Sequence, residues 1–262
     1  MKKLPLSVYI ISQDEADRIH YTINSVVDWA DEVIVVDSGS TDDTVKVSEE
    51  CGAKVSYNKW AGYGPQKNHA EKLCRNEWVM NLDADEEVQP ELRASIEALF
   101  SKGSPEKDAY WLKRKMLFFY EDKPAAVSAG DQMVRLYDRR KGSFKVSTVH
   151  DSVVLEEGAV DGGALDGVLW HRCFRDLSHQ AEKLNGYTTM LARDMVLKGR
   201  RPSSLRLIIE PFSAFFKSYI MRKFVFYGVE GFIESVSYAY IRMMRLAKAR
   251  EMWKKKDMGL ED

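Results

Sequence analysis

Residues 32–43 read EVIVVDSGSTDD, an apolar run that ends in an aspartate and leads directly into a turn. The apolar run predicts a strand at 32–37 that is buried on both faces of a sheet. The serine, threonine and aspartate side chains that follow can accept hydrogen bonds from free N–H groups at the start of a helix. This stretch therefore predicts the strand-to-helix unit of an α/β sheet.

The same pattern recurs on either side of this stretch. Further strands are predicted at 6–12, 54–57 and 78–83. One helix is predicted by the spacing of Ile19, Ile23, Val26 and Val27, and another opens at Pro90 because proline suits the first helical turn. Alternation of this kind predicts a mostly parallel sheet with helices on both faces and right-handed crossovers.

The pattern changes beyond residue 100. Short alternating segments within 109–170 predict mixed or antiparallel strands added to the parallel half. From Asp176 the pattern is helical to the end. We therefore expect a sheet domain at 1–175, made of the halves 1–100 and 101–175, and a helical appendage at 176–262.

Composition excludes several classes of protein. The 262 residues are 45% hydrophobic, which is enough to fill a core and argues against global disorder. A formal net charge of -1 gives no overall attraction to nucleic acid. Cys51, Cys74 and Cys173 form no zinc or CxxC spacing and fit a reducing compartment. No secretory signal and no apolar run long enough to span a bilayer is expected, so we predict a cytoplasmic protein.

Polar clusters follow three of the predicted strands: Ser12–Glu15, Asp37–Asp42 and Asp83–Asp85. Ligands of open parallel sheets bind at the carboxyl ends of the strands. Asp83 and Asp85 are two residues apart, so in extended backbone their carboxylates point the same way and suit Mg²⁺ or Mn²⁺. The alternative is a solvated acidic turn that caps the helix at Pro90.

Two further features are candidates for a nucleotide site. Asp37 can accept N–H groups of a nucleobase, or it can simply cap the following helix. The loop WAGYGPQKN at 60–68 places Gln66 and Lys67 at a helix start, where they can reach phosphates; an ordinary turn with a solvated lysine is the alternative.

These residues also carry a resemblance. The segments SVYIISQDEADRI, DEVIVVDSGSTDDT, WAGYGPQKNHA and WVMNLDADEEVQPEL resemble glycosyltransferase family 2, which has the GT-A (Rossmann-like) fold. Within that family the sequence is most similar to bacterial lipopolysaccharide inner-core glycosyltransferases of the β-1,4-glucosyltransferase type, through VRLYDRR, VHDSV and KLNGYTTMLA.

The resemblance implies roles for individual residues. It implies a UDP-sugar donor, and it makes residues 1–100 the nucleotide-binding half and 101–175 the acceptor side. Asp85 would be the main ligand of the divalent cation, with Asp83 near the ribose and the cation. Relatives commonly have Asn-Glu where this chain has Asp14-Glu15, so only Glu15 is carried over. The implied nucleotide-binding residues are Ser12, Glu15, Asp37, Gln66, Lys67 and Asp83.

The resemblance also implies an inverting displacement that needs a base for the acceptor hydroxyl. His150-Asp151 stands where relatives usually have His-Glu, and we favour Asp151 as the base with His150 orienting the acceptor or touching the cation. Both residues could instead cap a strand. His171 is a second candidate metal or phosphate ligand, although a lone histidine after an apolar strand is more often structural.

The C-terminal region is basic and rich in aromatic residues. Residues 198–256 hold 14 Lys and Arg against 4 Asp and Glu. Basic amphipathic helices of this composition bind anionic bilayers, so we expect peripheral contact with the inner face of the inner membrane. The alternative is packing on the sheet domain or on another subunit, which would make the chain a homo-oligomer through these helices.

The expected function is transfer of a hexose, with glucose inferred from the resemblance, to a lipopolysaccharide core acceptor such as heptose. A glycosyltransferase for another surface polysaccharide or lipid-linked acceptor is the nearest alternative. A nucleotidyltransferase would need a glycine-rich loop after the first strand, and SQDEADRI has no glycine. A phosphatase would need its nucleophilic Asp after the first strand, whereas DxD follows the fourth. A non-catalytic membrane scaffold is disfavoured by the intact Asp37, Asp83 and Asp85.

Overall fold

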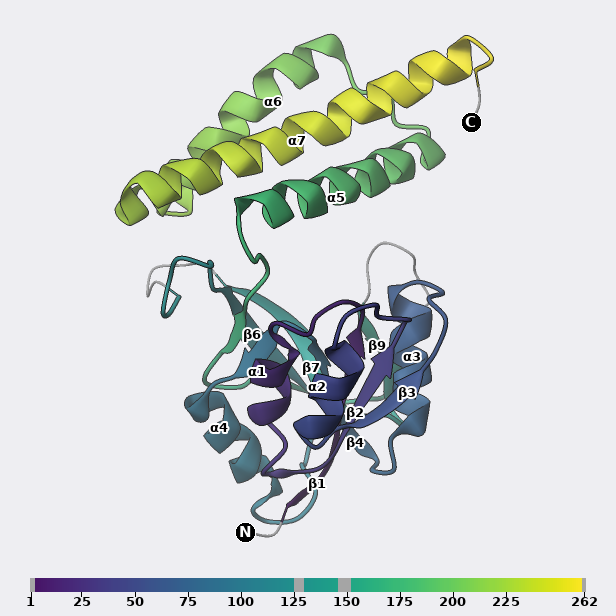
Figure 1. The fold of residues 1–262 in the computed structure, drawn as a ribbon, viewed down its shortest axis with the longest axis vertical. Helices are drawn as coiled ribbons and strands as arrows, with labels where there is room; N and C mark the ends of the chain where they lie inside the picture. Colours follow the sequence, from purple (N-terminus) through teal and green to yellow (C-terminus); the bar gives the residue numbers. More distant parts are fainter. Residues whose placement is uncertain (1–2, 125–129, 146–151, 261–262) are drawn as a thin grey trace. The chain divides into compact units, whose positions relative to one another are not determined.

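The computed structural model describes residues 3–124, 130–145 and 152–260, and they form two compact units. The first unit contains the described residues up to Cys173 and holds every strand of the described chain. The second unit runs from Phe174 onward and is helical (Figure 1).

The first unit is a mixed α/β sheet whose larger part is parallel. Its strand order is β3-β2-β1-β4-β7-β6-β11-β5, with β10 added beside β6. Its elements are β1 (Leu4–Ser12), α1 (Ile19–Asn24), β2 (Ala30–Asp37), α2 (Thr44–Glu50), β3 (Lys54–Tyr57), α3 (Tyr63–Leu73), β4 (Trp78–Asp83), β5 (Glu86–Val88), α4 (Pro90–Phe100), β6 (Ala109–Met116), β7 (Asp131–Asp138), β8 (Gly142–Phe144), β9 (Val153–Leu155), β10 (Asp161–Ala164) and β11 (Leu169–His171).

Both faces of the central strands are buried, as the continuous apolar runs predict. On β1, Val8 and Ile10 belong to one core cluster, and Tyr9 and Ile11 belong to the other. Side chains of α1 and α4 complete the first cluster, and Ala70 of α3 belongs to the second. Helices therefore cover both faces, and the predicted fold class is confirmed.

The second half of the unit extends the sheet in antiparallel fashion. β7 pairs antiparallel with both β4 and β6, and β5 pairs antiparallel with β11. β8 and β9 form a separate two-stranded sheet. The mixed character predicted for 109–170 is therefore correct.

The carboxyl ends of the three central parallel strands are level with one another. Ser12 is in register with Asp37 on β2, and Ile11 is in register with Asp83 on β4. Neighbouring strands lie about 5 Å apart, so only about 10 Å separates the strands that carry Asp37 and Asp83. The acidic strand ends therefore meet at one edge of the sheet, as predicted.

Two local predictions differ from the structure. The first helix ends at Asn24, and Val26 and Val27 follow it in a turn whose N–H groups bond to Ile23 O. Asp85 lies in a turn between β4 and β5 rather than in extended backbone, because the chain leaves the sheet centre there for its far edge. The two carboxylates of DxD consequently have different partners.

The second unit contains α5 (Leu177–Leu197), α6 (Ser204–Phe216) and α7 (Gly228–Asp257). A π-helical turn, η1 (Lys217–Met221), and a 3₁₀ turn, η2 (Phe224–Tyr227), join α6 to α7. Both α5 and α6 pack against α7, and α6 lies beside it in Figure 1. In the part of the chain that the structure describes, none of the helices has the length and apolar character needed to traverse a bilayer.

Candidate active site

The edge of the sheet at the end of β4 gathers charged side chains from four strands and one helix. Lys67 of α3 is almost fully buried, and its Nζ lies 2.9 Å from Asp83 Oδ1. Arg135 of β7 donates from Nη2 to Asp83 Oδ2 at 2.8 Å. Burial raises the pKa of Asp83, but the charges of Arg135 and Lys67 outweigh it and hold that pKa well below its usual value. Asp83 is therefore a fixed carboxylate that holds two cations.

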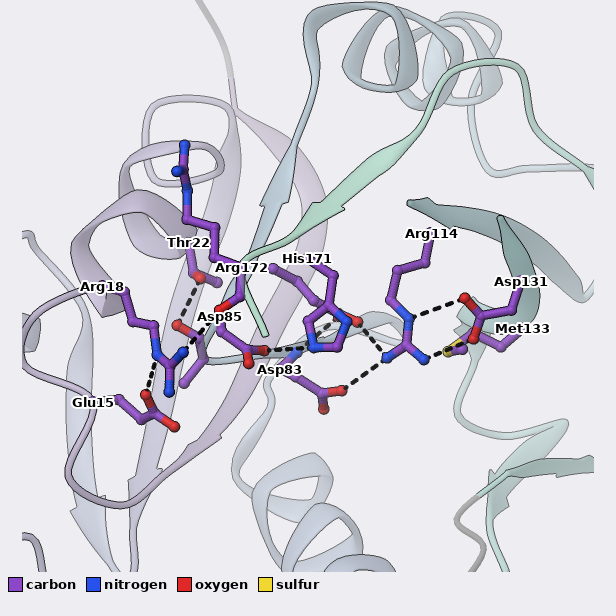
Figure 2. A network of polar contacts seen from close by, with 12 residues as sticks. Glu15, Arg18, Thr22, Asp83, Asp85, Arg114, Asp131, Met133, His171 and Arg172 are labelled. Atoms are coloured by element: carbon purple, nitrogen blue, oxygen red, sulfur yellow. Dashed lines mark hydrogen bonds and ion pairs between the residues drawn. The ribbon is translucent and has the colours of Figure 1, made fainter. Parts of the chain in front are cut away.

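A second set of charges supports this pair. Glu86 of β5 is fully buried, and its carboxylate accepts a hydrogen bond from Arg135 and another from Arg114 of β6, each at 3.2 Å. Arg114 also donates to Asp131 at 2.7 Å. Figure 2 shows this chain of contacts running from Asp83 to Asp131. Within this network three carboxylates are matched by three cations, so the buried charges of Lys67, Arg135 and Glu86 are paired.

Asp85 and His171 face each other beside this network. Asp85 is buried, and its Oδ1 lies 3.3 Å from His171 Nε2 (Figure 2). A backbone hydrogen bond joins the two segments that carry the pair, because Arg172 donates its backbone N–H to Asp85 O at 2.8 Å. The structure thus brings together two of the three side chains predicted as metal ligands, Asp85 and His171, from segments far apart in the sequence.

The donor set fits a divalent cation that is shared with a ligand. Within residues 3–124, 130–145 and 152–260, no three His, Cys, Asp or Glu side chains converge as a complete metal cage. Mg²⁺ and Mn²⁺ at phosphate sites commonly use one or two carboxylates, with phosphate and water oxygens for the remaining positions. The Asp85 carboxylate oxygen and the His171 imidazole nitrogen, which lie close together, are consistent with this mode of binding.

Glu15 belongs to a set of hydrogen bonds that links the segment after β1 to the residue that follows β11. Its carboxylate accepts a hydrogen bond from Arg18 Nε. Arg18 is buried and donates from Nη1 to Arg172 O at 2.8 Å, next to His171 (Figure 2). Glu15 is therefore part of the same edge, where it orients a buried guanidinium.

Asp37 and Ser12 form the base of the loop that follows β2. Asp37 Oδ1 accepts the N–H groups of Gly39 and Ser40, each at 2.8 Å, and Ser12 Oγ donates to Oδ2 at 3.3 Å. Both side chains are buried. Asp37 thus shapes the turn, and its predicted contact with a nucleobase stays a prediction.

Gln66 is fully buried and forms hydrogen bonds to two loops, one after β2 and one after β3. Its Nε2 donates to Ser38 Oγ and to Asn58 O, each at 3.0 Å, and its Oε1 accepts from Asn58 Nδ2 at 2.7 Å. Gln66 therefore supports the loop after Asp37, and a direct phosphate contact also stays a prediction. The predicted base and its neighbour, Asp151 and His150, lie outside the described residues.

Sequence reasoning missed the arginines of this site: Arg18, Arg114, Arg135 and Arg172. One signal was available for Arg135, because it interrupts the apolar strand MVRLYD at a position that the structure buries. A charged residue amid buried strand residues needs a charged partner. Its partners come from β4 and β5, and no local pattern points to them.

A family model described as Glycosyl transferase family 2 matches residues 7–106. A protein named "Uncharacterized glycosyltransferase" from Rickettsia felis (strain ATCC VR-1525 / URRWXCal2) is 39% identical over 253 residues, which cover 94% of this chain and 89% of the relative. The lipopolysaccharide core biosynthesis glycosyltransferase LpsC of Rhizobium meliloti (strain 1021) is 34% identical over 254 residues, which cover 94% of this chain and 92% of LpsC.

Among solved structures, S. aureus TarS 1-349 aligns with 98% of this chain and 92% of its own, at 15% identity and a TM-score of 0.43. Glucosyl-3-phosphoglycerate synthase from Mycobacterium tuberculosis, crystallised with Mn²⁺, UDP and glucosyl-3-phosphoglycerate, aligns with 77% of this chain and 82% of its own, at 17% identity and a TM-score of 0.45.

Proposed function

The chain belongs to glycosyltransferase family 2, and on that premise we propose that it is an inverting, metal-dependent hexosyltransferase. The donor is a UDP-sugar, with glucose as the sugar, and the acceptor is a heptose of the lipopolysaccharide core. The observation that carries the proposal is the meeting of Asp83, Asp85, Lys67 and His171 at the carboxyl edge of the sheet. The similarity to LpsC, whose name includes lipopolysaccharide core biosynthesis, supports the acceptor class.

Asp85 and His171 are the residues that would hold the divalent cation, and Asp83 lies beside them. When bound, the cation supplies Lewis-acid stabilisation for the negative charge that develops on the departing diphosphate. Lys67 is buried and charge-balanced by Asp83, so it presents a fixed positive charge to the same oxygens without having to reorganise. Arg135 holds Asp83 in place for that task.

The nucleoside would bind along the neighbouring strand ends. We assign Ser12, Glu15, Asp37 and Gln66 to this pocket, with Asp37 toward the uracil. The buried hydrogen bonds of Asp37 and Gln66 support this assignment indirectly, because they fix the loop that a base would contact. Asp83 and Lys67 continue the pocket toward the ribose and the diphosphate.

The transfer step is a single displacement. The acceptor oxygen forms a bond to the anomeric carbon as the bond to the β-phosphate oxygen breaks, and the electron pair leaves with UDP. The hydroxyl proton passes to Asp151, with His150 orienting the acceptor. Attack from the face opposite the leaving group inverts the anomeric centre.

The acceptor is built on a lipid, so we propose that the enzyme works in the cytoplasm on the inner face of the inner membrane. The basic and aromatic composition of residues 198–256 supports contact with that surface.

The test is a donor screen with Mg²⁺ and Mn²⁺, in which UDP release is measured against core acceptors purified from strains that lack this step. We expect UDP release to need both the cation and the acceptor, with UDP-glucose as the best donor. Efficient transfer from a different sugar nucleotide would correct the donor. UDP release that persists in a chelator would exclude the metal-dependent mechanism.

A further inference from the structure

The helix α6 is amphipathic, but it exposes its apolar side and buries a charged residue, Glu210. Leu205, Ile208, Ile209, Phe212 and Phe216 recur at helical spacing on a stripe about 100° wide, and each is more than half exposed. The buried residues of α6, Glu210 and Ala214, lie on the opposite side.

The inward side of α6 is held by charge. Glu210 accepts hydrogen bonds from Arg206 at 2.8 Å and from Arg245 of α7 at 2.5 Å, and Arg242 of α7 lies at 2.5 Å. Burial raises the pKa of Glu210, but these arginines outweigh it and lower the pKa to about 2. Ion pairs therefore fix the outward direction of the apolar stripe.

A second apolar stripe continues the first one on α7. Val229, Phe232, Val236 and Tyr240 share one side of α7 and are exposed, whereas Gly231, Glu234 and Ser235 are buried on the other side. The stripes adjoin, because the Phe232 ring packs 5.6 Å from Phe215 of α6. Between the helices, Met221 and Phe226 are 69% and 75% exposed. We call these exposed residues of α6, α7 and their connection the α6–α7 apolar surface.

The charges around this surface are mostly basic. Residues 198–240 hold seven Lys and Arg against three acids, of which Glu210 and Glu234 are buried and Glu230 is exposed. Lys217, Arg222 and Lys223 are exposed at the connection, and within the described part of the chain none of them forms an ion pair. A surface of this kind complements phosphate groups. A second copy would bring the same excess of basic side chains to a symmetric interface, with Glu230 as the exposed acid to meet them.

We propose that the α6–α7 apolar surface is the membrane-binding face of this enzyme, and that it lies in the headgroup region of an anionic bilayer. Met221 and Phe226 at the connection enter deepest, and Lys217, Arg222 and Lys223 bind lipid phosphates. The helices lie on the bilayer, and α6 with 13 residues is about 20 Å long. The inference rests on the proposed function in one respect: an acceptor carried on a lipid would require the enzyme to contact the membrane.

The test is flotation of the full chain with vesicles of phosphatidylglycerol and phosphatidylethanolamine, compared with phosphatidylcholine alone. We expect binding to the anionic vesicles that weakens in high salt. Phe212→Ser and Phe226→Ser should each lower the bound fraction about tenfold, because each removes a large apolar side chain from the buried face.

Met258→Ser is the matched control. Met258 is 71% exposed but follows the far end of α7, about 27 Å along the helix from Tyr240. It should float like the unaltered chain. Failure of the unaltered chain to float, or unchanged flotation of both phenylalanine variants, overturns the proposal. A fall in molar mass by light scattering in Phe212→Ser, without vesicles, assigns the surface to a second copy and overturns it as well.

A parallel measurement separates this inference from the proposed function. UDP release is followed in the same preparations with a delipidated core acceptor in solution. Variants that lose vesicle binding but keep UDP release support the membrane face and leave the transferase intact. An unaltered chain that floats without releasing UDP from any donor contradicts the proposed function alone.

Discussion

The two units of this protein place charge and apolar surface in opposite ways. In the sheet unit, apolar residues such as Val8 and Tyr9 fill both faces of the sheet, and the charges gather at one edge. In the helical unit, Glu210 lies inside against arginines, and Phe212 lies outside. Apolar surface left outside a folded unit needs a partner, so the comparison points to chemistry at the sheet edge and to docking on the helices.

The difference also separates two uses of buried ion pairs. At the sheet edge, ion pairs join Asp83 to Lys67 and Arg135 and fix groups of the proposed active site. Between α6 and α7, the Glu210 cluster orients a helix. Variants of the first set should therefore affect catalysis, and variants of the second should affect the stability of the helical unit.

The largest effect is expected for Asp85→Ala. Loss of the carboxylate would remove one of the two proposed protein ligands of the cation, and UDP release should fall about 10³-fold. Binding of Mn²⁺ in the presence of UDP, measured by calorimetry, should weaken in parallel, while thermal unfolding stays close to that of the unaltered chain. Asp28→Ala, an exposed acid paired with Arg93 in the same unit, is the control. Full activity of Asp85→Ala would refute the metal assignment.

The next largest effect is expected for Asp151→Asn. An amide cannot take the acceptor proton, so turnover should fall by about 10² to 10⁴. The KM for the donor should change little, because the proposed base acts on the acceptor. Initial rates over both substrates measure the two quantities, and His150→Gln is the companion variant. Turnover that hardly changes in Asp151→Asn but collapses in His150→Gln would make His150 the base.

Arg135→Lys should have an intermediate effect. Lysine keeps the charge but cannot bridge Asp83 and Glu86 as the guanidinium does, so kcat/KM should fall about 10- to 100-fold. Arg140→Lys, an exposed residue paired with Asp138, should leave kcat/KM unchanged. Vesicle binding should be normal in both variants. An equal loss in both would mean that Arg135 does not position Asp83.

The smallest effect on activity is expected for Glu210→Gln. Its amide would leave three arginines close together without a negative charge, so unfolding of the helical unit should cost about 1–3 kcal/mol less, as measured in urea by circular dichroism. UDP release with a delipidated acceptor should change less than twofold. Glu230→Gln at the exposed start of α7 is the control.

The same cluster predicts a dependence on pH. The pKa of Glu210 is about 2 in the folded chain against an ordinary 4.5, so its stabilisation is complete above about pH 4.5 and is lost as the pH falls toward 2. The urea midpoint of the helical unit should therefore drop between those values in the unaltered chain, and should drop less in Glu210→Gln. An equal drop in both would assign the acid sensitivity to other groups.

Local sequence patterns were sufficient for the central strands. β3 and β4 have the predicted limits, and β1 and β2 begin two residues earlier than predicted. The antiparallel additions were predicted as a class but not in their order, because β7 enters between β4 and β6 by pairings that no turn signal announces. The helix after β1 is shorter than its spacing predicts, because Val26 and Val27 belong to the turn that leads to β2.

The residues predicted for the candidate site include its carboxylates, Lys67 and His171, but none of its arginines. Carboxylates that follow apolar strands can be predicted from the sequence, because each one ends a strand with a recognisable pattern. The arginine partners of these carboxylates have no such local signal, because Arg135 contacts Asp83 across 52 residues of chain and Arg114 contacts Glu86 across 28. The extended geometry expected for DxD was wrong, since the chain turns at Asp85 toward the sheet edge.

The sequence by itself determined the parallel core, the edge at which its acids gather, the family and the basic character of the last helices. These follow from periodicity and from residue types at strand ends, which are local properties. Only the tertiary structure decided that His171 meets Asp85, that arginines neutralise Asp83 and Glu86, and that α6 turns its apolar side outward. Each of these depends on which distant segments pack together, and hydrophobic periodicity gives the width of a helix face but not its direction in the fold.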